Sequence, residues 1–462
     1  MKKTYKELVL IGITGVILSL SACEKFVELG APPTQVSYED AFATDASAQS
    51  VVLGLYVSAA GNINNANMSS MTTFYPGISG DDLQYNATDA TTLEFANNSL
   101  LNTNSAVSNL WSNLYQLIKN TNNAIAGLDA STSLTTNVKN QLLGEAKFIR
   151  AYTYFYLVNL YGDVPLALEN DNEVFENAQL PRASVEQVYT QIVEDLRDAE
   201  EKLAAVYQGT FRARVNKHAA SALLARVYLY RGDYANAELF STKVLTATDY
   251  QLPDPAVSFE NDSQEIIFQI ANLTGVTTFG ANYITSATVV PAYTLPEVVY
   301  NSFESAPTID LRRSNWTSLK TVADQVYYAI TKYKIASGTG NEYHVVLRLA
   351  EQYLIRAEAK AHQGDLAGAK ADLDALRARA GLAALGDNLS QAQLIRAVEQ
   401  ERLHELFGEY GHRWMDLKRT SRADEVLSAT KGNWRSTAAL FPIPQGQIVI
   451  NPSLTQNPGY ED

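Results

Sequence analysis

The chain of 462 residues has a single cysteine, Cys23, so no disulfide within the chain can hold the fold together. Stability must come from a buried core, which the 46% hydrophobic content permits. The five histidines lack the spacing of metal ligands, and we predict no metal and no cofactor. Acidic residues outnumber basic ones, which gives a net charge of −14. Because nucleic acid requires a basic surface, it is not an expected partner.

The longest uncharged apolar run lies near the start of the chain. Three lysines precede the stretch 8–20, which is too short to span a bilayer comfortably. Leu20-Ser21-Ala22-Cys23 follows, and small residues before a cysteine are what a lipoprotein signal peptidase needs. We therefore predict a signal peptide over 1–22, lipidation of Cys23, and attachment to a membrane through that lipid alone. A plain signal peptide with an incidental cysteine is the alternative.

Helical periodicity dominates the first half of the chain. It predicts helices over 38–58, 109–128, 137–161, 184–206 and 217–231. The segment 145–161 is apolar or aromatic nearly all the way round, so we expect other helices to surround it. Stretches rich in Asn, Ser and Thr at 58–73 and 97–108 indicate polar loops between these helices.

Two segments, 219–245 and 350–376, resemble each other. Each has a helix with small residues at helical spacing, then Gly-Asp, then a second helix. Small residues let antiparallel helices approach closely, as in tetratricopeptide hairpins. Two unrelated helical hairpins are the alternative.

Between 250 and 343 the periodicity changes, and residues 265–270 favour a short strand. The expected fold class is mostly α, with tetratricopeptide-like helical hairpins and a loop-rich, partly β segment in the second half. We place one region at 23–249 and a second at 250–462, packed as one unit.

No catalytic motif is complete in this sequence. His404-Glu405-Leu406-Phe407-Gly408 begins like a zinc-protease helix, but glycine replaces the second histidine. An aspartate of Asp81-Asp82 could serve a glycosidase only if another carboxyl lay at a set distance from it in space. The sequence does not place two carboxyls at such a distance. Glu399 and Arg402 fall within an apolar helical stripe, which predicts a structural ion pair. We therefore expect a binding protein and no enzyme.

Several ordered motifs together carry a family resemblance. They are Trp111, Leu114-Tyr115, Asn122-Asn123, Gly144 to Ala151, Tyr161 to Leu166, Leu223 to Leu229, Arg348, Tyr353 to Ala359, Glu401-Arg402, Gly411 to Leu417, Pro442-Ile443-Pro444 and Gln456 to Tyr460. With the cysteine motif at Cys23, they make the chain resemble the RagB/SusD family of nutrient-uptake outer-membrane lipoproteins of the Bacteroidetes, over nearly its whole length.

The resemblance implies a cell-surface location at the outer membrane and a SusC-like TonB-dependent outer-membrane transporter as partner. Members of the family deliver glycans, or sometimes peptides, to that transporter. The leading hypothesis is therefore capture of an oligosaccharide. Capture of a peptide is the alternative within the family, and a surface glycosidase or a helical scaffold are alternatives outside it.

A sugar-binding site needs flat aromatic rings with polar partners at their edges. Two segments fit this requirement, and their candidate ligand-binding residues are Tyr75, Asp81, Asp82 and Tyr85 in the first and Tyr283, Tyr293 and Trp316 in the second. The competing interpretation is that these aromatic residues pack in the core. Trp111 and Trp414 lie in the family motifs, and we assign both to packing.

Overall fold

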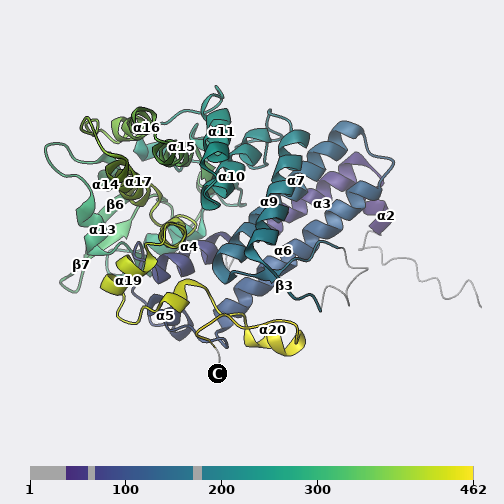
Figure 1. Ribbon diagram of the computed structural model, residues 1–462, viewed down its shortest axis with the longest axis horizontal. Helices are drawn as coiled ribbons and strands as arrows, with labels where there is room; N and C mark the ends of the chain where they lie inside the picture. The colour runs from purple at the N-terminus through teal and green to yellow at the C-terminus, as the bar shows by residue number, and fades with distance from the viewer. Residues whose placement is uncertain (1–37, 61–67, 170–178, 461–462) are drawn as a thin grey trace, which may run out of the picture.

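The computed structural model describes residues 38–60, 68–169 and 179–460, which are mostly helical (Figure 1). The helices up to residue 245 are α2 (Tyr38–Ala41), α3 (Asp45–Ala60), α4 (Met68–Ser79), α5 (Ala90–Ala96), α6 (Ser105–Ala130), α7 (Thr136–Tyr161), α9 (Val185–Lys202), α10 (Lys217–Tyr230) and α11 (Tyr234–Leu245). Those beyond are α12 (Thr278–Tyr283), α13 (Glu297–Ser302), α14 (Leu311–Trp316), α15 (Leu349–Gln363), α16 (Leu366–Arg379), α17 (Gln391–Leu406), α18 (His412–Arg419), α19 (Ala423–Thr430) and α20 (Gln445–Ile450). The predicted fold class is confirmed.

The strands in the described ranges are short and form two-stranded antiparallel sheets. They are β1 (Gln84–Tyr85), β2 (Val164–Pro165), β3 (Arg182–Ala183), β4 (Ile266–Ile270), β5 (Tyr293–Thr294), β6 (Thr317–Val322), β7 (Gln325–Ile330) and β8 (His344–Arg348). The pairs are β1 with β5, β2 with β3, β4 with β8, and β6 with β7. The strand predicted at 265–270 is β4, and every residue of it is buried.

Helix α7 lies at the centre of the first half. It packs along α6 and α9 and also touches α3 and α10, and Figure 1 shows these helices side by side. Its residues are almost all buried from Leu142 onward, which confirms the buried helix predicted at 145–161. Gly162 ends the helix with a φ of 73°, a conformation that glycine adopts at no steric cost.

The two predicted hairpins are α10–α11 and α15–α16. Each turns at a glycine with positive φ, Gly232 at 71° and Gly364 at 87°. Helix α11 packs against α15, so the two hairpins stack into one helical layer (Figure 1). The tetratricopeptide-like arrangement is therefore confirmed for these segments.

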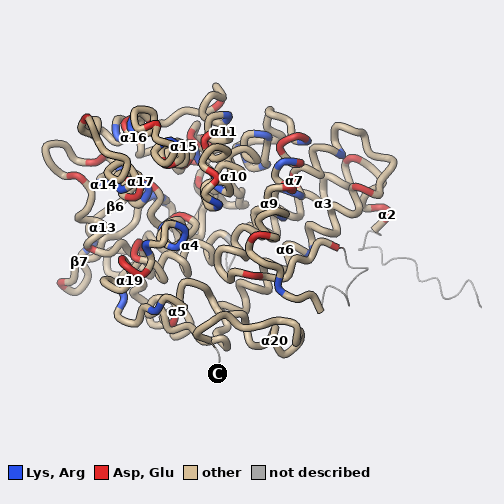
Figure 2. Tube along the Cα trace, in the orientation of Figure 1, with Lys and Arg blue, Asp and Glu red and all other residues tan. Residues whose placement is uncertain are grey.

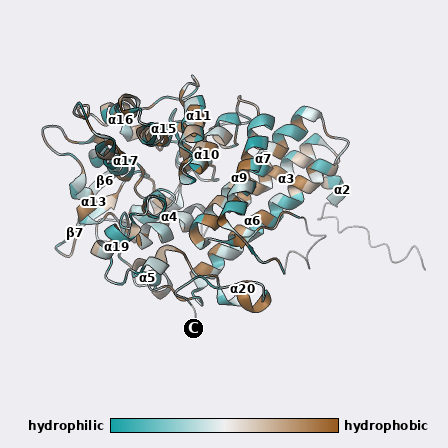
Figure 3. Ribbon diagram, viewed as in Figure 1, coloured by the Kyte–Doolittle hydropathy of each residue, from teal (hydrophilic) through white to brown (hydrophobic). Residues whose placement is uncertain are grey.

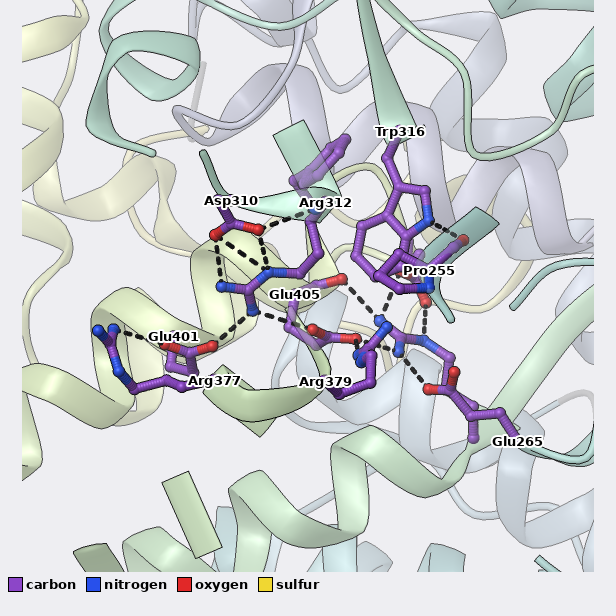
Figure 4. A network of polar contacts seen from close by, with 12 residues as sticks. Pro255, Glu265, Asp310, Arg312, Trp316, Arg377, Arg379, Glu401 and Glu405 are labelled. Carbon is purple, nitrogen blue, oxygen red and sulfur yellow. Dashed lines mark hydrogen bonds and ion pairs between the residues drawn. The ribbon is translucent and has the colours of Figure 1, made fainter. Parts of the chain in front are cut away.

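Buried ion pairs hold the second half together (Figure 4). Arg348, at the end of β8, contacts Glu265 at 2.8 Å, Glu405 at 2.5 Å and Glu409 at 2.8 Å. Arg312 contacts Glu405 from the other side at 3.0 Å. Burial by itself raises the pKa of Glu405, but the surrounding arginines hold that pKa well below its usual range. Glu405 of the incomplete zinc motif is therefore part of a structural ion cluster.

The ion pair predicted between Glu399 and Arg402 is wrong. Arg402 Nε contacts Asp416 Oδ2 at 2.7 Å, while Glu399 contacts Arg413 at 3.2 Å. Helical spacing put the two residues on one stripe, but partners from α18 lie closer to each. Figure 2 shows Lys and Arg interspersed with Asp and Glu along the Cα trace.

The loop predicted at 58–73 is wrong in its last part, because residues 68–79 form α4. The helix buries Met71, Phe74 and Ile78 against the core. Polar Ser and Thr on its other positions concealed this apolar side. Ser69, Thr72 and Thr73 are themselves buried, which a composition rule does not anticipate.

One hydrophobic cluster runs from Phe42 to Tyr460, so both halves of the chain share a core. A smaller cluster lies within α15, α16 and α17. Helix α20 stands at the edge of the molecule with Val449 and Ile450 exposed (Figure 3). No helix of the described residues is long and apolar enough to cross a membrane. The boundary between 249 and 250 stays a prediction.

Candidate functional site

The short β1–β5 pair brings the two predicted ligand-binding segments together. Gln84 lies opposite Thr294, and Tyr85 lies opposite Tyr293. More than 200 residues separate β1 from β5, and nothing in the sequence indicated that they pair. Asn86 strengthens the junction, because its side-chain amide donates to Pro291 O and Thr294 Oγ1.

Around this pair lies a group of residues that we call the tyrosine ledge: Tyr75, Tyr85, Asp89 and Tyr293. The Tyr85 and Tyr293 rings are tilted by 43° with centroids 5.3 Å apart. Burial, with Asp89 and Tyr85 nearby, raises the pKa of Tyr75 to about 12. Hydrogen bonds from Thr91 and Thr92 lower the pKa of Asp89, which is exposed and ionised at neutral pH. The ledge thus combines ring edges with one carboxylate.

Only part of this ledge reaches solvent. Tyr293 is stacked on Phe74 at 4.1 Å and 5° and is 7% exposed. Tyr75 is stacked on Phe95 at 4.3 Å, but it stays half-buried, as does Tyr85. A sugar needs an open ring face or a hydroxyl edge. Tyr75 and Tyr85 are therefore the predicted candidates that can still reach a ligand.

The carboxyls of Asp81 and Asp82 serve different partners. Asp81 makes a two-point contact with Arg413, at 2.7 and 2.9 Å. Asp82 is buried and accepts a hydrogen bond from Gly408 N at 3.1 Å. Burial raises the pKa of Asp82 to about 7. Asp81 therefore ties the chain after α4 to α18, and Asp82 ties it to the segment that joins α17 and α18. Asp82 is thus corrected from surface candidate to interior anchor.

Tyr283 and Trp316 also lie in the interior, each 1% exposed. The Tyr283 hydroxyl donates to Gly408 O at 3.1 Å, and Trp316 Nε1 donates to Pro255 O at 2.7 Å. Trp316 borders the buried ion cluster (Figure 4), with Lys332 Nζ 4.8 Å from its ring. Neither ring offers a face to a ligand, so the expected surface positions are corrected. Trp111 and Trp414 are buried, in accord with their assignment to packing.

A second aromatic surface near β5 was missed. Tyr300 of α13 and Tyr328 of β7 lie with ring centroids 4.6 Å apart, and the Arg313 guanidinium stands 4.3 Å from the Tyr300 ring. All three side chains are half-buried. The backbone of Tyr328 pairs with Leu295, directly after β5, which joins this surface to the ledge. The adjacent tyrosines Tyr327 and Tyr328 in the run 325–330 were the sequence feature that could have indicated this surface.

The described residues hold no group of three or more His, Cys, Asp or Glu side chains that could bind a metal ion. Cys23, the predicted lipidation site, lies outside the described residues. The surface chemistry of the ledge is that of tyrosine rings and one carboxylate, that of Asp89.

The chain is similar to known proteins over nearly its whole length. A family described as starch-binding associating with outer membrane matches residues 35–229, and the SusD family matches residues 276–460. SusD-like protein P2 of Formosa agariphila is 27% identical, covering 96% of this chain and 98% of its own length.

Two solved structures share the fold. A SusD superfamily protein from Bacteroides vulgatus has a TM-score of 0.82 and 19% identity, covering 90% of this chain and 99% of its own. A laminarin binding SusD-like protein has a TM-score of 0.76 and 25% identity, with 90% and 99% covered. Proteins of this family bind glycans and associate with the outer membrane. The ordered motifs, the stacked hairpins and these similarities together make the chain a member of the RagB/SusD family.

Proposed function

We propose that the protein captures an oligosaccharide at the tyrosine ledge and hands it to a SusC-like TonB-dependent outer-membrane transporter. The pairing of β1 with β5 carries this proposal, since it sets Tyr293 against Tyr85 and so joins the segment of Tyr75, Tyr85 and Asp89 to a segment more than 200 residues away. Tyr300 and Tyr328 extend the aromatic surface from the other side of β5. Rings beside hydrogen-bonding groups suit the C–H faces and hydroxyls of a sugar.

The glycan is proposed as a ligand and not as a substrate. A glycosidase needs two carboxyls that face one sugar linkage. Asp81 is engaged by Arg413, and Asp82 is 1% exposed, so neither is placed to attack or protonate a bound sugar. Among the ledge residues Asp89 alone supplies a carboxylate, and it caps α5. This arrangement supports binding without chemistry.

We further infer that Cys23 carries the lipid and that the body faces the cell exterior. A diacylglyceryl cysteine with a further acyl chain gives a durable tether without a membrane-spanning helix. The transporter then completes uptake, because a tethered binding protein cannot by itself move a ligand through a membrane.

Titration of the purified protein against a glycan panel, including starch and laminarin oligosaccharides, tests the proposal. Tyr75→Ala and Tyr85→Ala should each weaken binding by about 1 kcal/mol, roughly fivefold, because a ring contact with the sugar is removed. Tyr38→Ala, an exposed tyrosine on the remote helix α2, is the matched control and should bind like the parent.

Three results would count against the proposal. Product formation from any glycan would indicate an enzyme. Binding of peptides but of no glycan would indicate the peptide-capturing alternative. Equal affinity of the parent and both ledge variants would place the glycan elsewhere on the protein.

A further inference from the structure

A second candidate binding site lies at the start of α7, between α3 and the segment that follows α9. It is a cavity of about 380 Å³, which is within the size range of small-molecule sites. Its lining comes from α3, from residues 137–142 and from residues 202–214. We call it the amide pocket, because five of the lining side chains are carboxamides: Gln49, Asn137, Asn140, Gln141 and Gln208.

The amide pocket is separate from the tyrosine ledge. The other end of α7 packs toward the ledge, because Tyr161 contacts Phe441, which contacts Phe95 beneath Tyr75. From residue 140 to residue 161 the helix advances about 32 Å at 1.5 Å per residue. A short sugar bound at the ledge therefore does not reach this cavity.

Glu145, a fully buried residue of α7, fixes the inner wall of the pocket. It accepts hydrogen bonds from Gln141 Nε2 at 2.9 Å and from Arg214 Nε and Nη2 at 3.0 and 2.6 Å. The Tyr56 hydroxyl donates to the same carboxylate at 2.8 Å. Gln141 Oε1 in turn accepts from Ala204 N at 3.1 Å, which holds the segment after α9 against α7. The wall is thus ordered before any ligand binds, which lowers the entropic cost of binding.

Several hydrogen-bonding groups of the pocket are left without a protein partner. Arg214 Nη1 has none among the residues that the structure describes, and this nitrogen is open to solvent. The carboxamides of Gln49, Asn137, Asn140 and Gln208 also make no side-chain hydrogen bond to another described residue, and each is exposed or half-buried. A carboxamide supplies both donors and an acceptor. Free donors and acceptors from three parts of the chain therefore line one cavity, and a ligand can reach them.

The charges of the pocket are already balanced. Arg214 is paired with Glu145, and the other lining cation, Lys202, is paired with Asp198. The apolar part of the lining is formed by Val138, Leu142 and Leu203. A neutral sugar suits this combination, because its hydroxyls donate and accept as carboxamides do and its C–H groups can lie on aliphatic carbon.

We propose that the amide pocket is a second sugar-binding site, which takes a neutral unit of a glycan. The sugar hydroxyls pair with the free carboxamides and with Arg214 Nη1, and the ring lies against Leu142 and Leu203. The choice of a sugar rests on the proposed function, but the site goes beyond the ledge and uses none of its residues. Two sites on one chain hold a long glycan at two points, which raises the overall affinity without any new contact at the ledge.

The test is hydrogen–deuterium exchange of the purified protein, read by mass spectrometry, with and without saturating laminarihexaose or maltohexaose. At least one of these glycans should slow exchange in the pocket segments 137–142 and 202–208. The double variant Asn140→Ala, Gln208→Ala should lose that slowing, because it removes two of the free carboxamides. Asn433→Ala, which removes an exposed carboxamide outside the pocket, is the matched control and should behave like the parent.

Neither substituted side chain has a protein partner, so the double variant should fold and melt like the parent. Unchanged exchange in the pocket segments with both glycans, or slowing that persists in the double variant, would overturn the proposal. Exchange in the segment 84–96 reports on the ledge in the same experiment. Slowing there alone would overturn the amide pocket, and slowing in the pocket segments alone would overturn the ledge, so the two failures are distinguishable.

Discussion

Asp82→Asn should make the protein more stable, relative to the parent, at pH 8 than at pH 4.5. Burial raises the pKa of Asp82 from 3.8 to about 7, so the native state holds a proton that the unfolded state has already released. Where the native state binds more protons, stability falls as pH rises. The parent therefore loses stability between about pH 4 and pH 7, and asparagine carries no titrating proton there.

The size of the effect follows from the pKa difference. Each unit corresponds to about 1.4 kcal/mol, so a shift of about three units changes the free energy of unfolding by roughly 4 kcal/mol across this window. Gly408 N can still donate to the asparagine oxygen, as it does to Asp82 Oδ2 at 3.1 Å. The added amide N–H₂ lacks an acceptor where Asp82 Oδ1 has no partner, which costs about 1–3 kcal/mol at every pH. The change with pH is therefore the diagnostic quantity.

Urea unfolding of both proteins at pH 4.5, 6 and 8 measures it. The unfolding free energy of Asp82→Asn minus that of the parent should increase by several kcal/mol from pH 4.5 to pH 8. Asp89→Asn is the control: hydrogen bonds lower the pKa of Asp89, so its stabilisation is lost only as pH falls below about 3.8, and its difference should stay flat. A pH-independent difference for Asp82→Asn would refute the reasoning.

Three further predictions concern the core and the anchor. Arg348→Met should lower the unfolding free energy by about 3–5 kcal/mol in urea, since Glu265, Glu405 and Glu409 would lose a buried partner; an unchanged midpoint would contradict this. Trp316→Phe should lower the unfolding free energy by about 1–3 kcal/mol, because Pro255 O loses its donor, yet leave glycan affinity as in the parent. Altered affinity with intact stability would restore Trp316 as a ligand contact. Cys23→Ala should give a folded body without surface display, measured by labelling of intact cells, and retention at the surface after a high-salt wash would argue against the tether.

The sequence by itself determined those features that depend on local periodicity. Helix α7, both hairpins and β4 were predictable because their apolar spacing and turn glycines act within a few residues. The hairpin of β6 and β7 was missed because its turn residues are Ala323 and Asp324, both with positive φ, where Asn-Gly would have signalled the turn. The lipidation motif and the family motifs are equally local, and the family follows from them.

Tertiary structure alone decided which side chains face solvent and which segments meet. Tyr85 and Trp316 look alike as loop aromatics in sequence, yet one is half-buried at the ledge and the other packs against a buried ion cluster. Arg402 lies in the interior as predicted, but Asp416 of α18 is its partner at 2.7 Å, while Glu399, one turn earlier in α17, contacts Arg413 of α18. Burial and pairing between distant segments depend on the whole packed chain, and no local pattern encodes them.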